Sequence, residues 1–139
     1  MRIGFTGTRQ GMTGEQARAL RDLLTAHPGA VLHHGDCVGA DEQAHHIAVS
    51  LGCSVVIHPP LVDKQRAFKS ALRIRTPKPY LVRNKDIVRE TELLVATPAE
   101  ASEQHRSGTW STVRFARRQG RAICIIQPDG TVIREVAGG

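Results

Sequence analysis

The sequence predicts one Rossmann-like α/β domain, in which a doubly wound, mostly parallel sheet carries helices on both faces. Two observations predict this fold. Short apolar segments of strand length alternate along the chain with longer segments of helical periodicity, as in a parallel sheet with crossover helices. The expected strands are almost continuously apolar, as strands buried on both faces are. The 139 residues fit a single domain, 1–139, since compact domains have about 100 to 150 residues.

Local signals place the individual elements. An apolar run predicts a first strand at residues 2–6, ended by the turn residue Gly7. A first helix is expected over residues 14–26, because Thr13 and Gln16 form the pattern of a capping box and leucines recur on one face. Further strands are expected at residues 30–33, 54–57, 93–96 and 122–126, and further helices at residues 41–51, 80–89 and 107–119.

Two segments depart from this alternation. Asp129-Gly130 is a hairpin signal, so residues 131–136 are expected to return as an antiparallel edge strand. Residues 61–79 are the least regular part of the chain. A basic helical piece is expected over residues 65–74, and the prolines that follow prevent its continuation. We interpret residues 61–79 as a mobile insert and a candidate lid.

The charge of the chain indicates anionic partners. Its formal net charge is +6, which favours nucleic acid, nucleotides or phosphorylated metabolites. The excess is concentrated in residues 64–89, where lysines and arginines far outnumber acidic residues. Only five residues of the chain are aromatic, which is too few for an extended base-stacking surface on single strands.

Other classes of protein are not expected. No apolar stretch approaches the roughly 20 residues of a membrane span, and the N-terminus lacks the pattern of a signal peptide. We therefore expect a cytoplasmic protein without a membrane partner. The three cysteines form no CxxC pair and the histidines show no zinc-ligand spacing, so we expect reduced thiols and assign neither a metal nor another cofactor.

The loops after the strands are the places to look for chemistry, because open α/β sheets bind ligands beyond the carboxyl ends of their strands. Gly7-Thr8-Arg9 follows the first strand. After the second strand, Gly35 and Gly39 let a ligand approach the backbone closely. Asp41 stands at the start of the next helix, where it could cap the helix or accept ribose hydroxyls. Asp36 has no such structural role and is expected to face the ligand.

Two more segments could contribute to a binding site. Ser107 and Thr109 flank Gly108 at a helix start, where hydroxyls and free amides meet the positive end of the helix dipole. The same pattern is also that of an ordinary serine cap followed by a turn glycine. Arg83-Asn84 could direct a guanidinium at a phosphate or carboxylate, or Arg83 could lie solvated on the surface. Trp110 belongs either to an interface or to the core.

These motifs, in this order and spacing, resemble the SLOG superfamily, which unites DNA-processing protein A and the lysine-decarboxylase-like Lonely guy (LOG) phosphoribohydrolases. Gly7-Thr8-Arg9 resembles the Gly-Ser-Arg turn of the DNA-processing proteins, and residues 35–45 resemble their Gly-rich loop with its trailing Ala-His. Residues 83–87 resemble their Arg-Asn-Arg-x-Ile segment, and residues 107–121 their Ser-Gly helix start. The resemblance covers most of the chain and implies a Rossmann-like domain whose Gly-rich loops hold a nucleotide or a nucleic-acid phosphate.

The resemblance leaves the activity open. In LOG-type phosphoribohydrolases a glutamate needed for glycosidic cleavage stands where this sequence has Thr112. The first hypothesis is therefore binding of a nucleotide or nucleotide-derived phosphoribosyl ligand, as a sensor or sequestering protein. The second is a nucleoside-monophosphate N-glycosidase, with Asp36 or Asp41 as tentative catalytic carboxylates. The third is single-stranded DNA binding through the basic segment. The resemblance also implies a homo-oligomer.

Overall fold

The computed structural model describes residues 1–138 and confirms the α/β fold. Outside residues 61–79, each expected element lies within one residue of its predicted bounds. The strands are β1 (Arg2–Gly7), β2 (Val31–His34), β3 (Ser54–Ile57), β4 (Arg73–Ile74), β5 (Leu93–Thr97), β6 (Ala122–Ile126) and β7 (Val132–Glu135). The helices are α1 (Gly14–Thr25), α2 (Ala40–Ser50), α3 (Tyr80–Arg89) and α4 (Gly108–Arg118), with a short 3-10 helix, η1 (Asp63–Gln65).

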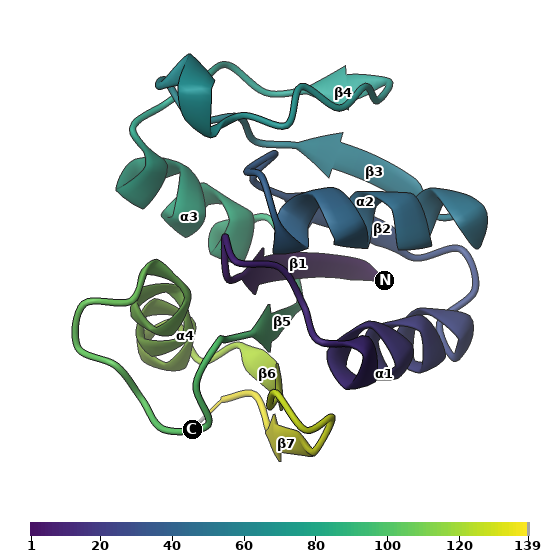
Figure 1. Cartoon of the computed structure of the whole chain (residues 1–139), viewed down its shortest axis with the longest axis vertical. Helices are drawn as coiled ribbons and strands as arrows, with labels where there is room; N and C mark the ends of the chain where they lie inside the picture. The colour runs from purple at the N-terminus through teal and green to yellow at the C-terminus, as the bar shows by residue number, and fades with distance from the viewer. Residues whose placement is uncertain (139) are drawn as a thin grey trace.

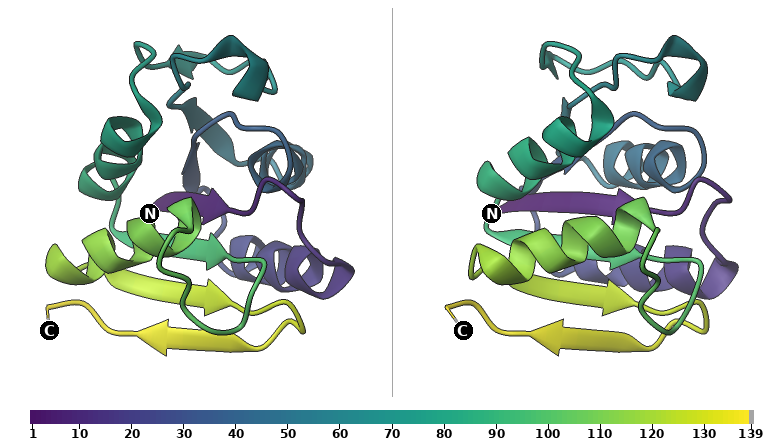
Figure 2. Two further views of the ribbon diagram at one scale, coloured as in Figure 1. Left: turned by 60° about the vertical axis from the view of Figure 1, so that its left-hand side comes forward. Right: turned by 90° about the vertical axis from the view of Figure 1, so that its left-hand side faces the viewer.

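The strands form one seven-stranded sheet in the order β4-β3-β2-β1-β5-β6-β7 (Figure 1). All neighbours are parallel except β7, which runs against β6 as the edge strand that the hairpin signal predicted (Figure 2). β1 lies in the middle and is hydrogen-bonded to β2 on one side and β5 on the other. The winding reverses there, so the carboxyl ends of β1 and β5 form the topological switch point at which such sheets bind ligands.

Helices cover both faces of the sheet, with one apolar core between the sheet and the helices on each face (Figures 1 and 2). α1 and α2 pack over a core that includes Leu20, Leu24 and Leu32. α3 and α4 pack over a second core, which includes Val113 and Trp110. Trp110 is only 3% exposed. Of its two predicted locations, interface or core, it therefore occupies the core. Among residues 1–138, no helix combines the length and apolar character that a membrane crossing needs.

The capping box predicted for α1 is confirmed, and it also ties this helix to the sheet. The Thr13 hydroxyl accepts the Gln16 amide at 3.1 Å, and the Gln16 side-chain oxygen accepts the Thr13 amide at 3.0 Å. The Gln16 side-chain nitrogen donates to the carbonyls of Pro98 and Ile126 at 2.8 and 2.9 Å. These bonds from Gln16 therefore fix the ends of β5 and β6 at the carboxyl edge of the sheet.

The helix predicted over residues 65–74 is wrong. Beyond the single turn of η1, the segment follows the sheet edge, where β4 pairs with β3. Asp36 supplies a physical reason, since its carboxylate accepts the Lys69 amide at 2.9 Å and its carbonyl accepts the Ala67 amide at 2.8 Å. These bonds satisfy backbone groups that would otherwise need helical partners. A lid function for the segment stays a prediction.

Candidate functional site

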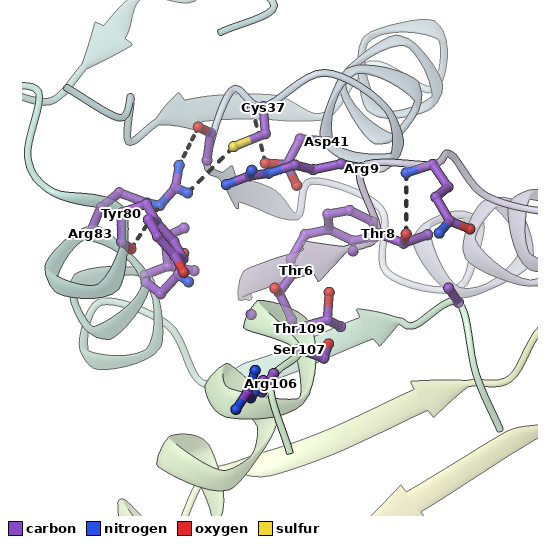
Figure 3. Close-up of a pocket in the computed structure, with 18 of the residues that line it drawn as sticks. Thr6, Thr8, Arg9, Cys37, Asp41, Tyr80, Arg83, Arg106, Ser107 and Thr109 are labelled. Atoms are coloured by element: carbon purple, nitrogen blue, oxygen red, sulfur yellow. Dashed lines mark hydrogen bonds between the residues drawn. The ribbon is translucent and has the colours of Figure 1, made fainter. Parts of the chain in front are cut away.

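A cavity of about 350 Å³ opens at the topological switch point, and we call it the switch-point cavity (Figure 3). The exits of β1 and β2, the start of α2, and the amino ends of α3 and α4 contribute to its wall. It collects most of the residues that the sequence singled out, namely Gly7, Thr8, Arg9, Gly35, Asp41, Arg83, Asn84, Ser107, Gly108 and Thr109. Asp36 and Gly39 are the two that do not line it.

The amino end of α4 supplies hydrogen-bond donors to the cavity. Ser107 caps the helix, its hydroxyl accepting the Trp110 amide at 3.2 Å, and this leaves the hydroxyl hydrogen free to donate outward. The amides of Gly108 and Thr109 belong to the first turn, where a helix offers its N–H groups no internal partner. These donors sit at the positive end of the helix dipole, so this wall of the cavity favours an anion.

The β1 exit loop packs so closely that two glycines are required. A Cβ at Gly7 would collide with the hydroxyl of Thr97 and the methyl of Ala40. Gly39 has a φ of 90°, and a Cβ there would collide with the carbonyl of Arg9. Gly39 therefore does not line the cavity, but its missing side chain allows the start of α2 to pack directly against the backbone of the β1 exit.

Arg83 is not a surface residue but a buried link between three elements. Its side chain, on α3, is part of a residue only 4% exposed. One terminal nitrogen donates to the carbonyls of Gly35 and of His58, the latter at 3.0 Å, and the other lies 3.4 Å from the Cys37 sulfur. The guanidinium thus joins the exits of β2 and β3 to α3, and carbonyl oxygens compensate its buried charge.

Asp41 is the buried carboxylate of the cavity. It lies in the first turn of α2 but does not cap it, since the cap residue is Gly39 and no side chain accepts there. Its carboxylate instead accepts the Cys37 amide at 3.1 Å. Burial raises the pKa of Asp41 to about 6, although the nearby Arg83 guanidinium lowers it. Near neutral pH, Asp41 can therefore exchange a proton with something in the cavity.

Asp36 faces away from the switch-point cavity, contrary to the expectation that it faces the ligand. It is fully buried, and its carboxylate accepts the Lys69 amide at 2.9 Å and Arg66 Nε at 3.3 Å. Its φ of 54° lies in the left-handed region, which aspartate tolerates better than most residues. The two neighbours of Asp36, Gly35 and Cys37, line the cavity. Asp36 itself points to the opposite side and is hydrogen-bonded to the segment 61–79.

The structure adds cavity residues that were not among the predicted site residues. Arg106 lies at the mouth beside α4, and Tyr80 lies across from it at the start of α3 (Figure 3). The Arg9 guanidinium stacks over the Tyr80 ring, 5.4 Å from its centroid. Arg106 could have been found because it directly precedes the capping serine. Nothing in the local sequence distinguishes Tyr80 from the first residue of any other helix.

Two groups with possible chemistry turn out to be unsuited to it. Thr112, at the position where LOG-type enzymes carry their glutamate, donates its hydroxyl to the Gly108 carbonyl at 2.9 Å inside α4 and does not line the cavity. Cys37 does line the cavity, but burial raises the pKa of its thiol. The reactive thiolate form is thereby disfavoured, so Asp41 is the acid–base group best placed for chemistry.

Several solved structures share this fold. The molybdenum cofactor binding protein from the phototrophic bacterium Rippkaea orientalis superposes with a TM-score of 0.72 at 21% identity, over 91% of this chain and 76% of that one. DNA processing protein A from Streptococcus pneumoniae gives a TM-score of 0.68 at 17% identity, over 89% of this chain and 49% of that one. A structural-genomics target, TM1055, gives 0.65 at 16% identity, over 88% and 71%.

These likenesses confirm the Rossmann-like α/β fold that the sequence predicted. This chain spans about half the length of the DNA processing protein. No protein-family model and no curated protein sequence matches it.

Proposed function

We propose that the protein binds a nucleotide or a nucleotide-derived phosphoribosyl ligand in the switch-point cavity, as a sensor or sequestering protein. One observation carries the proposal. The amino end of α4, the β1 exit loop and the cations of Arg9 and Arg106 converge on one cavity at the carboxyl edge of the sheet. Among the side chains that the structure describes, which exclude that of Asp63, neither arginine forms an ion pair. Their charges are therefore available to an incoming anion.

The phosphate belongs at the α4 side of the cavity. There the Gly108 and Thr109 amides and the Ser107 hydroxyl offer uncharged donors, and Arg106 adds a guanidinium that can bind two phosphate oxygens at once. Thr6, whose hydroxyl lies in the same wall, extends this set of donors. Such a cluster selects a phosphate or carboxylate group over a neutral ligand.

The sugar and base belong at the opposite side, near α2 and α3. Asp41 presents a carboxylate oxygen that can accept ribose hydroxyls, as acidic residues at this edge of a Rossmann-like sheet do. Tyr80 offers an aromatic ring beside it, with Arg9 stacked on that ring. A flat base can pack on this pair of side chains. The proposed orientation is therefore phosphate on α4 and base on Tyr80.

The names of two neighbours in fold support a ligand-binding function. One of them is a molybdenum cofactor binding protein and another is a DNA processing protein. We therefore include the molybdenum cofactor and an oligonucleotide among the probes for this chain. DNA binding through residues 64–89 is less well supported, because cations of that segment are already neutralised by carboxylates. Arg75 pairs with Glu90 at 2.7 Å, and Lys78 pairs with Asp86 at 2.6 Å.

N-glycosidic hydrolysis is the second candidate, and the Asp41 carboxyl is the observation that favours it. In that reaction the bond between C1′ and the base nitrogen breaks, water adds its oxygen to C1′, and a proton goes to the departing base. With its pKa raised to about 6, Asp41 could supply that proton as the acid and stabilise positive charge at C1′ as the carboxylate. The other carboxylate considered for this role, Asp36, lies outside the cavity.

A thermal-shift panel tests the proposal. The probes are nucleoside mono-, di- and triphosphates, ribose 5-phosphate, the molybdenum cofactor and a short oligonucleotide, and each mixture is then analysed for free base. A ligand at 100 times its Kd stabilises the fold by about 2.7 kcal/mol. We expect Arg106→Ala to weaken binding of the best ligand about 10- to 100-fold, as loss of a charge-assisted hydrogen bond does. Arg18→Ala removes an exposed charge from α1, away from the cavity, and should change nothing.

Each outcome of the panel decides between the candidates. A mononucleotide that binds and stays intact supports the sensor or sequestering protein. Binding with release of free base supports hydrolysis, and Asp41→Asn should then abolish release while binding persists. If only the oligonucleotide binds, and its affinity falls steeply with salt as counterion release requires, the small-molecule proposal is wrong.

A further inference from the structure

A second hollow of about 150 Å³ lies next to Arg83. Arg83 lines both spaces. His58 and Glu90 also line the second hollow, and His33 contacts His58. None of these three residues belongs to the switch-point cavity, so whatever they bind is separate from the ligand proposed above.

The parallel register of β2 and β3 brings the two histidines together. His33 pairs with Val56 across the two strands. Residue 58 lies two positions further along, and side chains two residues apart share a face of the sheet. His33 Nδ1 and His58 Nε2 are 2.9 Å apart, and both residues are almost completely buried. Their face is the one that α3 covers, and Glu90 is the C-cap residue directly after α3.

The three side chains form a compact donor set. One nitrogen from each histidine and one carboxylate oxygen of Glu90 all lie within 4.8 Å of one another. Zinc binds nitrogen at about 2.0–2.1 Å, which places two nitrogens of a tetrahedral site about 3.3 Å apart. A separation of 2.9 Å becomes such a distance if the rings move apart by a few tenths of an ångström and turn so that both nitrogen lone pairs point at the ion.

The contact between the two histidine rings is one that a metal ion can take over. Only one hydrogen can occupy the contact between the two ring nitrogens, and a metal ion can replace it. Imidazole pairs combined with one carboxylate suit zinc among the abundant divalent ions, whereas magnesium and calcium prefer oxygen ligands alone.

Arg75 is the group that a metal ion must displace. Its guanidinium donates to one Glu90 oxygen through Nε at 3.2 Å and Nη2 at 2.7 Å. The Arg75 side chain is 45% exposed, so it can turn into solvent without leaving a buried charge unpaired. Lys78 is already neutralised by Asp86. Competition with Arg75 therefore lowers the affinity for a metal but does not exclude it.

From this geometry we infer that His33, His58 and Glu90 form a binding site for a divalent transition-metal ion, with zinc as the physiological choice. Three protein ligands leave a fourth position, and the second hollow, which His58 and Glu90 line, offers room for it. An open position of this kind is typical of catalytic rather than structural zinc sites, and water occupies it at rest. The two histidines lie 25 residues apart in the sequence, which is why their spacing did not reveal the site.

Zinc titration of the metal-free full-length chain tests this inference, with isothermal calorimetry and the melting temperature as readouts. We expect one ion per chain. Glu90→Gln keeps the shape and an acceptor for Arg75 but removes the charged ligand, and should weaken zinc binding at least tenfold, since even residues behind the ligands contribute about 10- to 100-fold. Arg75→Ala removes the competitor and should tighten binding. A purely structural contact between the histidines predicts no such gain.

Two controls identify where the ion sits. His46 is an exposed histidine on α2, so His46→Ala removes a surface ligand and should leave the affinity unchanged. Cobalt should give the visible absorption of a four-coordinate site without the charge-transfer band of a cysteine ligand. The inference is overturned if no ion binds, if Glu90→Gln and Arg75→Ala both match the parent protein, or if His46→Ala abolishes binding.

Discussion

Asp41→Asn should make the ligand-free protein more stable at neutral pH. The carboxylate is buried, and its pKa rises from an ordinary 3.8 to about 6 even though Arg83 attracts it. The folded state therefore holds the Asp41 proton more tightly than the unfolded chain does. Between pH 3.8 and 6 the folded state binds more protons, so stability from this group falls as pH rises through that window and stays low above it.

The size of the effect follows from the shift. A shift of one pKa unit corresponds to about 1.4 kcal/mol, so ionisation of Asp41 costs the folded state about 3 kcal/mol above pH 6. Asparagine has nearly the same shape, can still accept the Cys37 amide, and carries no charge to desolvate. We therefore expect Asp41→Asn to raise the free energy of unfolding by up to about 3 kcal/mol at pH 7.5 and to change little at pH 4.

Urea unfolding of both proteins at pH 4, 5, 6 and 7.5 measures this difference. Asp22→Asn is the matched control, because Asp22 is exposed on α1 and its replacement should give a small, nearly pH-independent change. If Asp41→Asn is no more stable than the parent at pH 7.5, or if the difference does not grow between pH 4 and 6, burial does not govern this carboxyl group. The acid–base role considered for it would then lose its basis.

Three further substitutions test how the site is built. Gly39→Ala should cost about 1–3 kcal/mol in urea unfolding, because a Cβ there meets backbone; Gly52→Ala, also at positive φ but in open space, should cost less. Asp36→Ala should expose residues 61–79 to limited trypsin digestion, whereas Asp36→Asn, which keeps an acceptor, should protect them better. Arg83→Met should lower the free energy of unfolding by about 1–3 kcal/mol per carbonyl left unpaired, and an unchanged value would contradict its linking role.

Much of the fold could be predicted from the sequence because the signals for it are local. Apolar runs of strand length, the Thr13–Gln16 capping box and Asp129-Gly130 each specify one element without reference to the rest. The prediction of a helix over residues 65–74 failed because the conformation of this segment depends on Asp36. Asp36 is distant in sequence and accepts hydrogen bonds from the amides of Ala67 and Lys69. A helical propensity is weak compared with such tertiary contacts.

Most residues that line the candidate cavity could be predicted from the sequence, but the directions of their side chains could not. The rule that ligands bind beyond the strand ends selected the loops that line the switch-point cavity. It could not decide between Asp36 and Asp41, because the direction of each side chain is set by the backbone, and Asp36 has a φ of 54°. The pairing of His33 with His58 depends on strand register, which no pattern within either strand reveals.

The switch-point cavity draws its wall from both helical layers, Asp41 from α2 on one side and Arg83 and Gly108 from α3 and α4 on the other. A molecule seated there would act as an additional cross-link between the two helical layers. Opening of either layer would then require the ligand to leave. Amide hydrogen exchange should therefore slow together in α2 and in the first turns of α3 and α4 when the cavity is filled.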